Sequence, residues 1–144
     1  MLMPDVNVLI YAHRVEDPAH RIYARWLDEL LAGPAPFALS VLVAGAFVRI
    51  VTNPRFSSAP ATLDEALGFI EGLASAPNCR VVGAGAGNWA ILRDLCRAAK
   101  IRGARISDAQ HAAIAIEHGC TLVSRDPDFR RFERHGLDFE LLEP

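Results

Sequence analysis

The sequence has no apolar run long enough to cross a membrane, although 51% of its 144 residues are hydrophobic. A spanning helix needs about 20 consecutive apolar residues, and residues such as Arg49 and Pro54 interrupt every apolar stretch before that length. The amino terminus has no basic region and reaches an acid already at Asp5, unlike a secretory signal. We therefore expect a cytoplasmic protein without membrane attachment, whose hydrophobic residues fill a core.

Cysteine and lysine are both scarce. The three cysteines, Cys79, Cys96 and Cys120, are widely spaced and include no Cys-x-x-Cys pair, which disfavours a disulfide framework and a thiolate zinc site. Of the 15 basic residues only Lys100 is a lysine, and the net charge is −2. No overall positive field attracts nucleic acid, so any nucleic-acid site must depend on where the arginines lie.

Internal repeats, low-complexity tracts and linkers are absent as well, and this length suits a single domain spanning residues 1–144. Short apolar strands alternate with helical patterns from end to end. This alternation predicts a three-layer α/β/α domain with a mostly parallel sheet, whose sites gather at the carboxyl ends of the strands. We expect strands ending near residue 5 and at 37–39, 80–82, 121–124 and 139–142, with helices at 6–12, 18–31, 41–52, 62–73, 88–100 and 107–118.

Capping signals place several helix starts. Thr62 and Glu65, like Ser107 and Gln110, have the spacing of a capping box, and Asp17 precedes a proline suited to a first helical position. The alternating glycines at 83–87 lack the full Gly-x-Gly-x-x-Gly spacing and a following Lys-Ser/Thr, so they predict a loop and not a phosphate site.

Four aspartates flank the predicted strands. Asp5 ends the first strand, Asp126 and Asp128 follow the strand at 121–124, and Asp108 opens the helix before that strand. In a parallel sheet all four can meet at one edge. Clustered carboxylates raise one another's pKa and most often hold a hard cation, and oxygen ligands favour Mg²⁺ or Mn²⁺ over zinc.

Three of the acids could have a structural role instead of binding a cation. Asp108 could serve the dipole of its helix, and Asp126 and Asp128 could cap a short helix that runs through Phe129. Asp5 has no comparable explanation, because it interrupts an apolar amino terminus.

The same segments resemble a known family. Residues 5–12, 47–55, 107–115 and 124–129 are similar to the motifs of the PIN-domain family, specifically of VapC toxins from bacterial toxin–antitoxin pairs. Among these toxins, the four motifs resemble the branch that carries an Arg-x-x-Thr-Asn-Pro-Arg segment. The likeness runs from about residue 2 to 142, and four ordered motifs are collectively specific although each alone is weak.

The resemblance implies a Mg²⁺-dependent endoribonuclease that acts as a toxin and forms a PIN-like fold. It assigns Asp5, Asp108 and Asp126 to the metal and to catalysis, with Asp128 as a helper. Asn7 and Ser124 match polar positions that orient the site. Several arginines are candidates for holding the RNA backbone: Arg125, Arg130, Arg131 and Arg134 around these acids, and Arg49, Arg55, Arg102 and Arg105 in neighbouring segments.

The resemblance also implies two partners, a VapB-like antitoxin that covers the acidic groove and a second copy of the chain. The apolar residues Ile22, Trp26 and Leu30, with the helix at 41–51, would supply a dimer surface unless they are all internal core.

Two alternatives to a fully active ribonuclease stay open. Many family members carry a further glutamate where this chain has Ala46, so the chain could be a catalytically weak PIN domain that mainly binds antitoxin or RNA. A phosphoacceptor receiver domain also sets aspartates at strand ends. It usually needs a lysine on a late strand, however, and Lys100 ends a helix.

Overall fold

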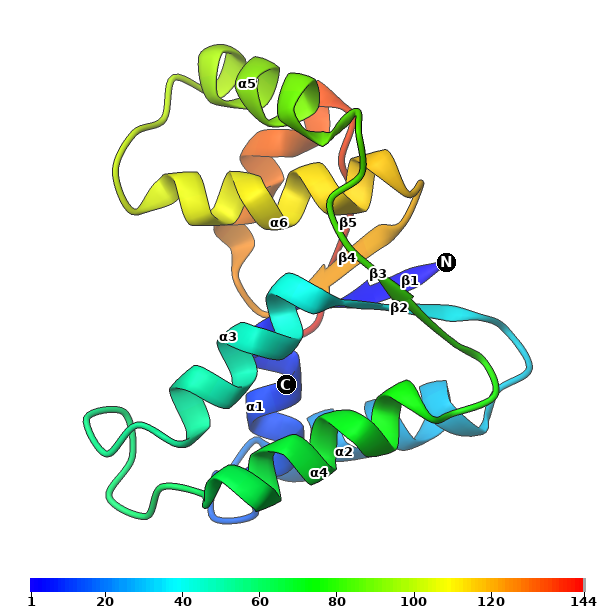
Figure 1. Ribbon diagram of the computed structural model, residues 1–144, viewed down its shortest axis with the longest axis vertical. Coiled ribbons are helices and arrows are strands. Elements are labelled where there is room, and N and C mark those ends of the chain that lie inside the picture. The colour runs from blue at the N-terminus through cyan, green and yellow to red at the C-terminus, as the bar shows by residue number, and fades with distance from the viewer. Residues whose placement is uncertain (144) are drawn as a thin grey trace.

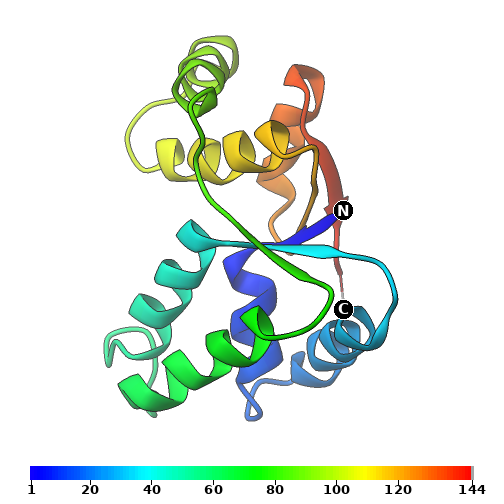
Figure 2. The same ribbon diagram turned by 45° about the vertical axis from the view of Figure 1, so that its right-hand side comes forward.

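A five-stranded sheet forms the centre of the computed structural model, which describes residues 1–143 (Figures 1 and 2). The strand order is β3-β2-β1-β4-β5, and all neighbouring pairs run parallel. The prediction of a mostly parallel sheet is confirmed. The strands are β1 (Leu2–Pro4), β2 (Phe37–Ser40), β3 (Cys79–Val82), β4 (Thr121–Ser124) and β5 (Asp138–Leu141).

Helices cover both faces of the sheet and complete the three layers (Figure 1). Side chains alternate between the faces of a strand, so in β2 Ala38 packs in the core under one helical layer and Leu39 in the core under the other. One layer contains α1 (Val6–His13), α2 (His20–Ala32), α3 (Val41–Val51) and α4 (Leu63–Ala74); the other contains α5 (Asn88–Ala99), α6 (Arg105–Glu117) and a 3₁₀ helix, η1 (Pro127–His135).

Most predicted helix starts are confirmed, but two are wrong. Thr62 caps α4 as expected, since its hydroxyl accepts the Glu65 N–H at 3.1 Å. By contrast α6 begins at Arg105, where Ser107 already lies in the first turn with its N–H bonded to the Ala104 carbonyl and makes no cap. Asp17 accepts the Ala19 N–H in a turn that precedes α2. In both places the tertiary path of the chain overrides the local capping pattern.

The strand order places a crevice next to β1. After β1 the chain builds β2 and β3 on one side, and it then returns to add β4 and β5 on the other. Ligands of parallel sheets bind at such a reversal, beyond the carboxyl ends of the strands. The Asp5 N–H donates to the Val123 carbonyl at 2.8 Å, which holds the ends of β1 and β4 together.

Within residues 1–143, none of the helices combines the length and the apolar character that crossing a membrane requires. The expectation of one domain over residues 1–144 stays a prediction, and Pro144 lies outside the described residues.

Candidate active site

Asp5 is the most enclosed acid of the predicted site, with 3% of its surface exposed. Its Oδ1 accepts the Val6 N–H at 2.7 Å and thereby caps α1, while its Oδ2 accepts the Ser124 hydroxyl at 2.7 Å. The carboxylate is therefore fixed by the backbone that follows β1 and by the last residue of β4. These donors are neutral, so they orient the charge of Asp5 without cancelling it.

Asn7 and Ser124 join the two strand ends around Asp5. The Asn7 side-chain amide donates to Ser124 Oγ at 3.1 Å, and its oxygen accepts the Arg125 N–H at 3.2 Å. Ser124 Oγ also accepts the Asp126 N–H at 3.0 Å. Ser124 therefore contacts both acids, and Asn7 is linked to them through Ser124 and the Arg125 backbone; their role in orienting the site stays a prediction.

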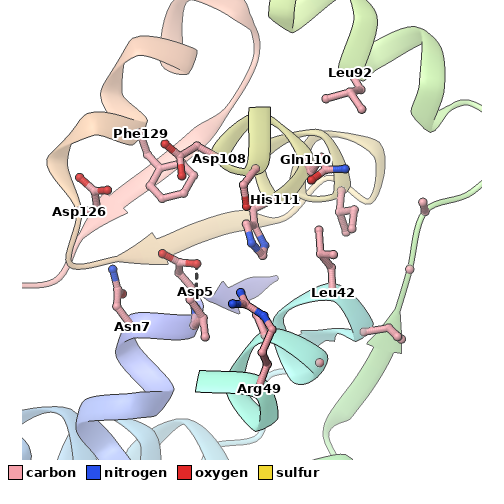
Figure 3. A pocket seen from close by; sticks show the side chains of 18 of the residues that line it. Asp5, Asn7, Leu42, Arg49, Leu92, Asp108, Gln110, His111, Asp126 and Phe129 are labelled. Carbon is pink, nitrogen blue, oxygen red and sulfur yellow. Dashed lines mark hydrogen bonds between the residues drawn. The ribbon is translucent and has the colours of Figure 1, made fainter. Parts of the chain in front are cut away.

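A cavity of about 920 Å³ opens beside these residues (Figure 3). Its wall includes Asp5, Asn7, Asp108 and Asp126, so three of the four predicted acids face one space. Asp108 reaches the cavity from the first turn of α6. Asp126 reaches it from the N-cap position of η1. The cavity thus lies at the reversal of strand order, where the sheet topology predicts a site.

Two acids of the cavity, Asp5 and Asp108, resist ionisation. Burial raises the pKa of Asp5 above its ordinary value, while the electrostatic field of His111 and the Ser124 hydrogen bond oppose that rise. Burial also raises the pKa of Asp108, and the carboxylates of Asp126 and Asp5 raise it further. Electrostatic repulsion of this kind is relieved by a cation.

The donors fit a particular kind of cation. Within residues 1–143, no three His, Cys, Asp or Glu side chains converge tightly enough to hold a metal ion by themselves. Mg²⁺ does not require such a cage, because it keeps several waters and is usually bound by one or two carboxylates together with substrate phosphates. An all-oxygen donor set with room for water therefore suits this hard cation.

Four predicted site residues lie outside the cavity wall formed by the described residues: Ser124, which bonds to Asp5 behind that wall, and Asp128, Arg125 and Arg130. Asp128 places its carboxylate 3.6 Å from Arg105 and 3.7 Å from Arg131. Arg125 stacks its guanidinium over the Tyr11 ring, 4.2 Å from the centroid. Arg130 is exposed on η1.

His111 is a cavity residue that the sequence analysis missed. It is 7% exposed, and its Nδ1 is buried without a hydrogen-bond partner among the described residues. The signal that could have found it is its spacing: His111 follows Asp108 by three residues and so shares its face of α6. On the opposite wall, α3 contributes Ala46 and Arg49, and Arg49 is exposed toward the same space (Figure 3).

Comparisons with known proteins agree with this geometry. A family model described as PIN domain matches residues 2–135. The chain is 41% identical over 132 residues to Ribonuclease VapC25 of Mycobacterium tuberculosis, covering 92% of this chain and 93% of that protein. It is 36% identical over 142 residues to Ribonuclease VapC43 of the same organism, covering 96% and 97%.

Solved structures share the fold. VapBC2 from Rickettsia felis, bound to a DNA fragment from its promoter, matches with a TM-score of 0.73 at 21% identity over 99% of this chain and 98% of that one. VapC20 of Mycobacterium tuberculosis, a toxin that cleaves the sarcin–ricin loop, matches with a TM-score of 0.69 at 16% identity over 100% of both.

The family match rules out the receiver-domain alternative. The chain belongs to the PIN-domain family and, within it, to the VapC ribonucleases of toxin–antitoxin systems.

Proposed function

We propose that this VapC ribonuclease is a Mg²⁺-dependent endoribonuclease that cuts RNA in the cytoplasm at the acidic end of the cavity. The observation that carries the proposal is the convergence of Asp5, Asp108 and Asp126 on one space at the reversal of strand order. Relatives named as ribonucleases, at about 40% identity over most of both chains, support the reaction class.

Asp5, Asp108 and Asp126 would hold the ion directly or through water, and Mn²⁺ would fit the same oxygen ligands. The bound ion supplies positive charge to the scissile phosphate and lowers the pKa of an attacking water. Ser124 and Asn7 keep the Asp5 carboxylate aimed at the cavity. Asp128 would help position water through Asp126, whose carboxylate already accepts the Asp128 N–H at 2.9 Å.

Negative charge that develops on the phosphate needs cationic neighbours. Arg49 projects into the cavity from α3, one turn after Ala46, and is available to a phosphate oxygen there. Arg125, just before η1, and Arg130, on η1, would contact the RNA backbone, with Arg125 held in position by its stacking on Tyr11.

We also assign the chain to the branch of the family with the Arg-x-x-Thr-Asn-Pro-Arg segment. Here the segment begins at Arg49 and closes α3: the Thr52 hydroxyl donates to the Val48 carbonyl at 2.6 Å, and the Asn53 side chain accepts the Arg55 N–H at 2.9 Å. The helix ends at Val51, two residues after Arg49, which supports a role of the motif in presenting that arginine.

Replacing two acids together tests the metal site. The double variant Asp5→Asn with Asp108→Asn should lose Mg²⁺-dependent cleavage of purified RNA while retaining its circular dichroism spectrum. A matched double variant, Asp64→Asn with Asp94→Asn, changes two exposed acids outside the cavity and should cleave like the wild type. Undiminished cleavage by the first double variant would refute the assignment.

Calorimetric titration with Mg²⁺ distinguishes the enzyme from the catalytically weak alternative that Ala46 suggests. We expect wild-type protein to bind the ion and to cut RNA. A wild-type protein that shows neither metal heat nor cleavage, yet binds RNA or an antitoxin, would support the weak PIN domain instead.

The proposed partners are a VapB-like antitoxin and a second copy of the chain. Structures that share the fold include toxin–antitoxin complexes, among them VapBC2 and FitAB bound to DNA. Trp26 and Leu30 pack against the core, but Ile22 is 41% exposed and Val41 57% exposed, which leaves apolar surface for an interface. Copurification with the product of a small neighbouring reading frame, and light scattering of the purified chain, would test the two partners separately.

A further inference from the structure

The cavity extends well beyond the acids. In Figure 3 the His111 ring stands between the carboxylates on one side and Leu42, Leu92 and Gln110 on the other. We call this second part of the cavity, lined by Leu42, Leu92, Gln110 and Asn88, the apolar arm. A hydrated ion and one phosphate would occupy only the acidic end, which would leave the arm to another part of the substrate.

Two amide side chains border the apolar arm. Asn88 opens α5 and shares a helix face with Leu92, four residues later. Its side-chain nitrogen is buried without a hydrogen-bond partner among the described residues, an unsatisfied donor that gains a bond when the side chain turns toward a ligand acceptor in the cavity. Gln110 is exposed on α6 at the same cavity. Amides offer a donor and an acceptor side by side, which matches the edge of a nucleobase.

The wall that carries Asn88 is fixed before any ligand arrives. The loop preceding α5 is tied to the end of α6, where Glu117 Oε1 accepts the Gly85 N–H at 2.9 Å and His118 Nε2 donates to the Gly83 carbonyl at 2.7 Å. Gly85 fits because a Cβ there would lie 2.7 Å from Glu117 Oε2. A preformed apolar pocket with a few polar groups is typical of a site for a small rigid moiety such as an aromatic base.

We propose that the apolar arm binds the base of the nucleotide next to the scissile phosphate, and that Asn88 and Gln110 read the edge of that base. The inference rests on the proposed ribonuclease function and adds the recognition of one unpaired base. Proteins recognise single-stranded RNA by this combination of apolar contact and hydrogen bonds to exposed base edges.

Sequencing the cut ends of short single-stranded RNAs, randomised around the cleavage position, tests the proposal. Wild-type protein should prefer one or two bases at a position beside the cut. Gln110→Met keeps the length of the side chain but removes both hydrogen-bonding groups, and should reduce the ratio of kcat/KM between best and worst base by about tenfold. Asn88→Asp turns the buried donor into an acceptor and should change which base is preferred.

A control variant outside the cavity, and an antitoxin peptide as a second ligand, distinguish the possible outcomes. Ala98→Met places a methionine on an exposed position of α5 outside the cavity and should keep the wild-type base ratios. Because Gln110 is exposed, its replacement should leave circular dichroism and calorimetric Mg²⁺ binding unchanged. RNA cleavage by Gln110→Met and Asn88→Asp with unaltered base ratios would overturn this inference alone, whereas a wild-type protein that cuts no RNA would overturn the proposed function. Weaker binding of an antitoxin peptide with unaltered base ratios would also overturn it and assign the arm to protein.

Discussion

Asp5, inside the cavity, and Asp128, just outside it, are held by different interactions. Asp5 is 3% exposed and receives hydrogen bonds from the neutral Ser124 hydroxyl and the Val6 N–H. The Asp128 side chain is 55% exposed and faces Arg105 and Arg131. The fold therefore places two arginines against the acid that water already solvates, whereas burial raises the pKa of the enclosed acid despite the field of His111.

On the proposed function, we expect this difference to separate acids that hold the ion from an acid that is held mainly by surface ion pairs. Surface ion pairs contribute little to stability, whereas a buried carboxylate without a cation lowers it. A fold retains such a carboxylate where a cation or a substrate supplies the missing charge. Substitutions that change one side chain at a time test this division.

The largest effect is expected from Asp126→Asn. The new amide oxygen can still accept the Asp128 N–H and cap η1, so the variant should fold while losing the charge at the cavity. We expect kcat/KM for RNA with Mg²⁺ to fall by about a hundredfold or more. Steady-state kinetics beside a circular dichroism melt would measure both properties. Activity within about threefold of the wild type would show that the charge of Asp126 is not used.

A smaller loss is expected from Ser124→Ala, which removes the hydroxyl bound to Asp5. We expect kcat/KM to fall by about tenfold, the value of one hydrogen bond to a charged group. The bond lowers the pKa of Asp5, so its loss should also move the acidic limb of the pH–rate profile to higher pH. Ser75→Ala, on the exposed end of α4, is the matched control. An unmoved acidic limb would mean that Ser124 does not tune the carboxylate.

The positions of the main acids could be predicted because local patterns determine them. Asp5 follows a short apolar strand and Asp126 follows another, and parallel strands bring their carboxyl ends to one edge whatever the helices do. Ser124 and Asn7 were identified through the family motifs, and the structure places both between these strand ends.

The features that the sequence did not predict depend on contacts between distant segments. The start of α6 is set by the turn at Gly103, with its φ of +64°, and not by Ser107. The cation–π contact that takes Arg125 away from the cavity needs Tyr11, which lies on another helix. In the sequence His111 is one more position on an apolar helix, and only the fold brings it close to Asp5.

A modest gain in stability is expected from Asp108→Asn in metal-free buffer. Burial and two neighbouring carboxylates raise the pKa of Asp108 above 3.8, so the folded state binds this proton more tightly than the unfolded state does. The contribution of Asp108 to stability is therefore complete below the unfolded pKa and is lost as the pH rises through the folded pKa. At pH 7 with a chelator, the variant should melt above the wild type.

When Mg²⁺ is added, the wild type should melt above Asp108→Asn, because only the wild type retains the full set of ligands and gains stability by binding the ion. Well below pH 3.8 the two proteins should melt alike, since both side chains are then uncharged in the folded and the unfolded state. A wild-type midpoint that does not respond to Mg²⁺ would argue against an ion at this end of the cavity.

The smallest effect is expected from Asp128→Asn, the same chemical change as Asp126→Asn made two residues later. Losing exposed ion pairs to Arg105 and Arg131 should cost less than about 1 kcal/mol of unfolding free energy. Activity should stay within about threefold at physiological salt. Because the variant leaves two arginines without their carboxylate, RNA should bind somewhat more tightly at low salt, and the difference should fade as salt screens it. A loss as large as that of Asp126→Asn would mean that Asp128 leaves its arginines and enters the cavity when RNA binds. The ion pairs would then be a resting position of a catalytic acid, and exposure would no longer separate the two kinds of carboxylate.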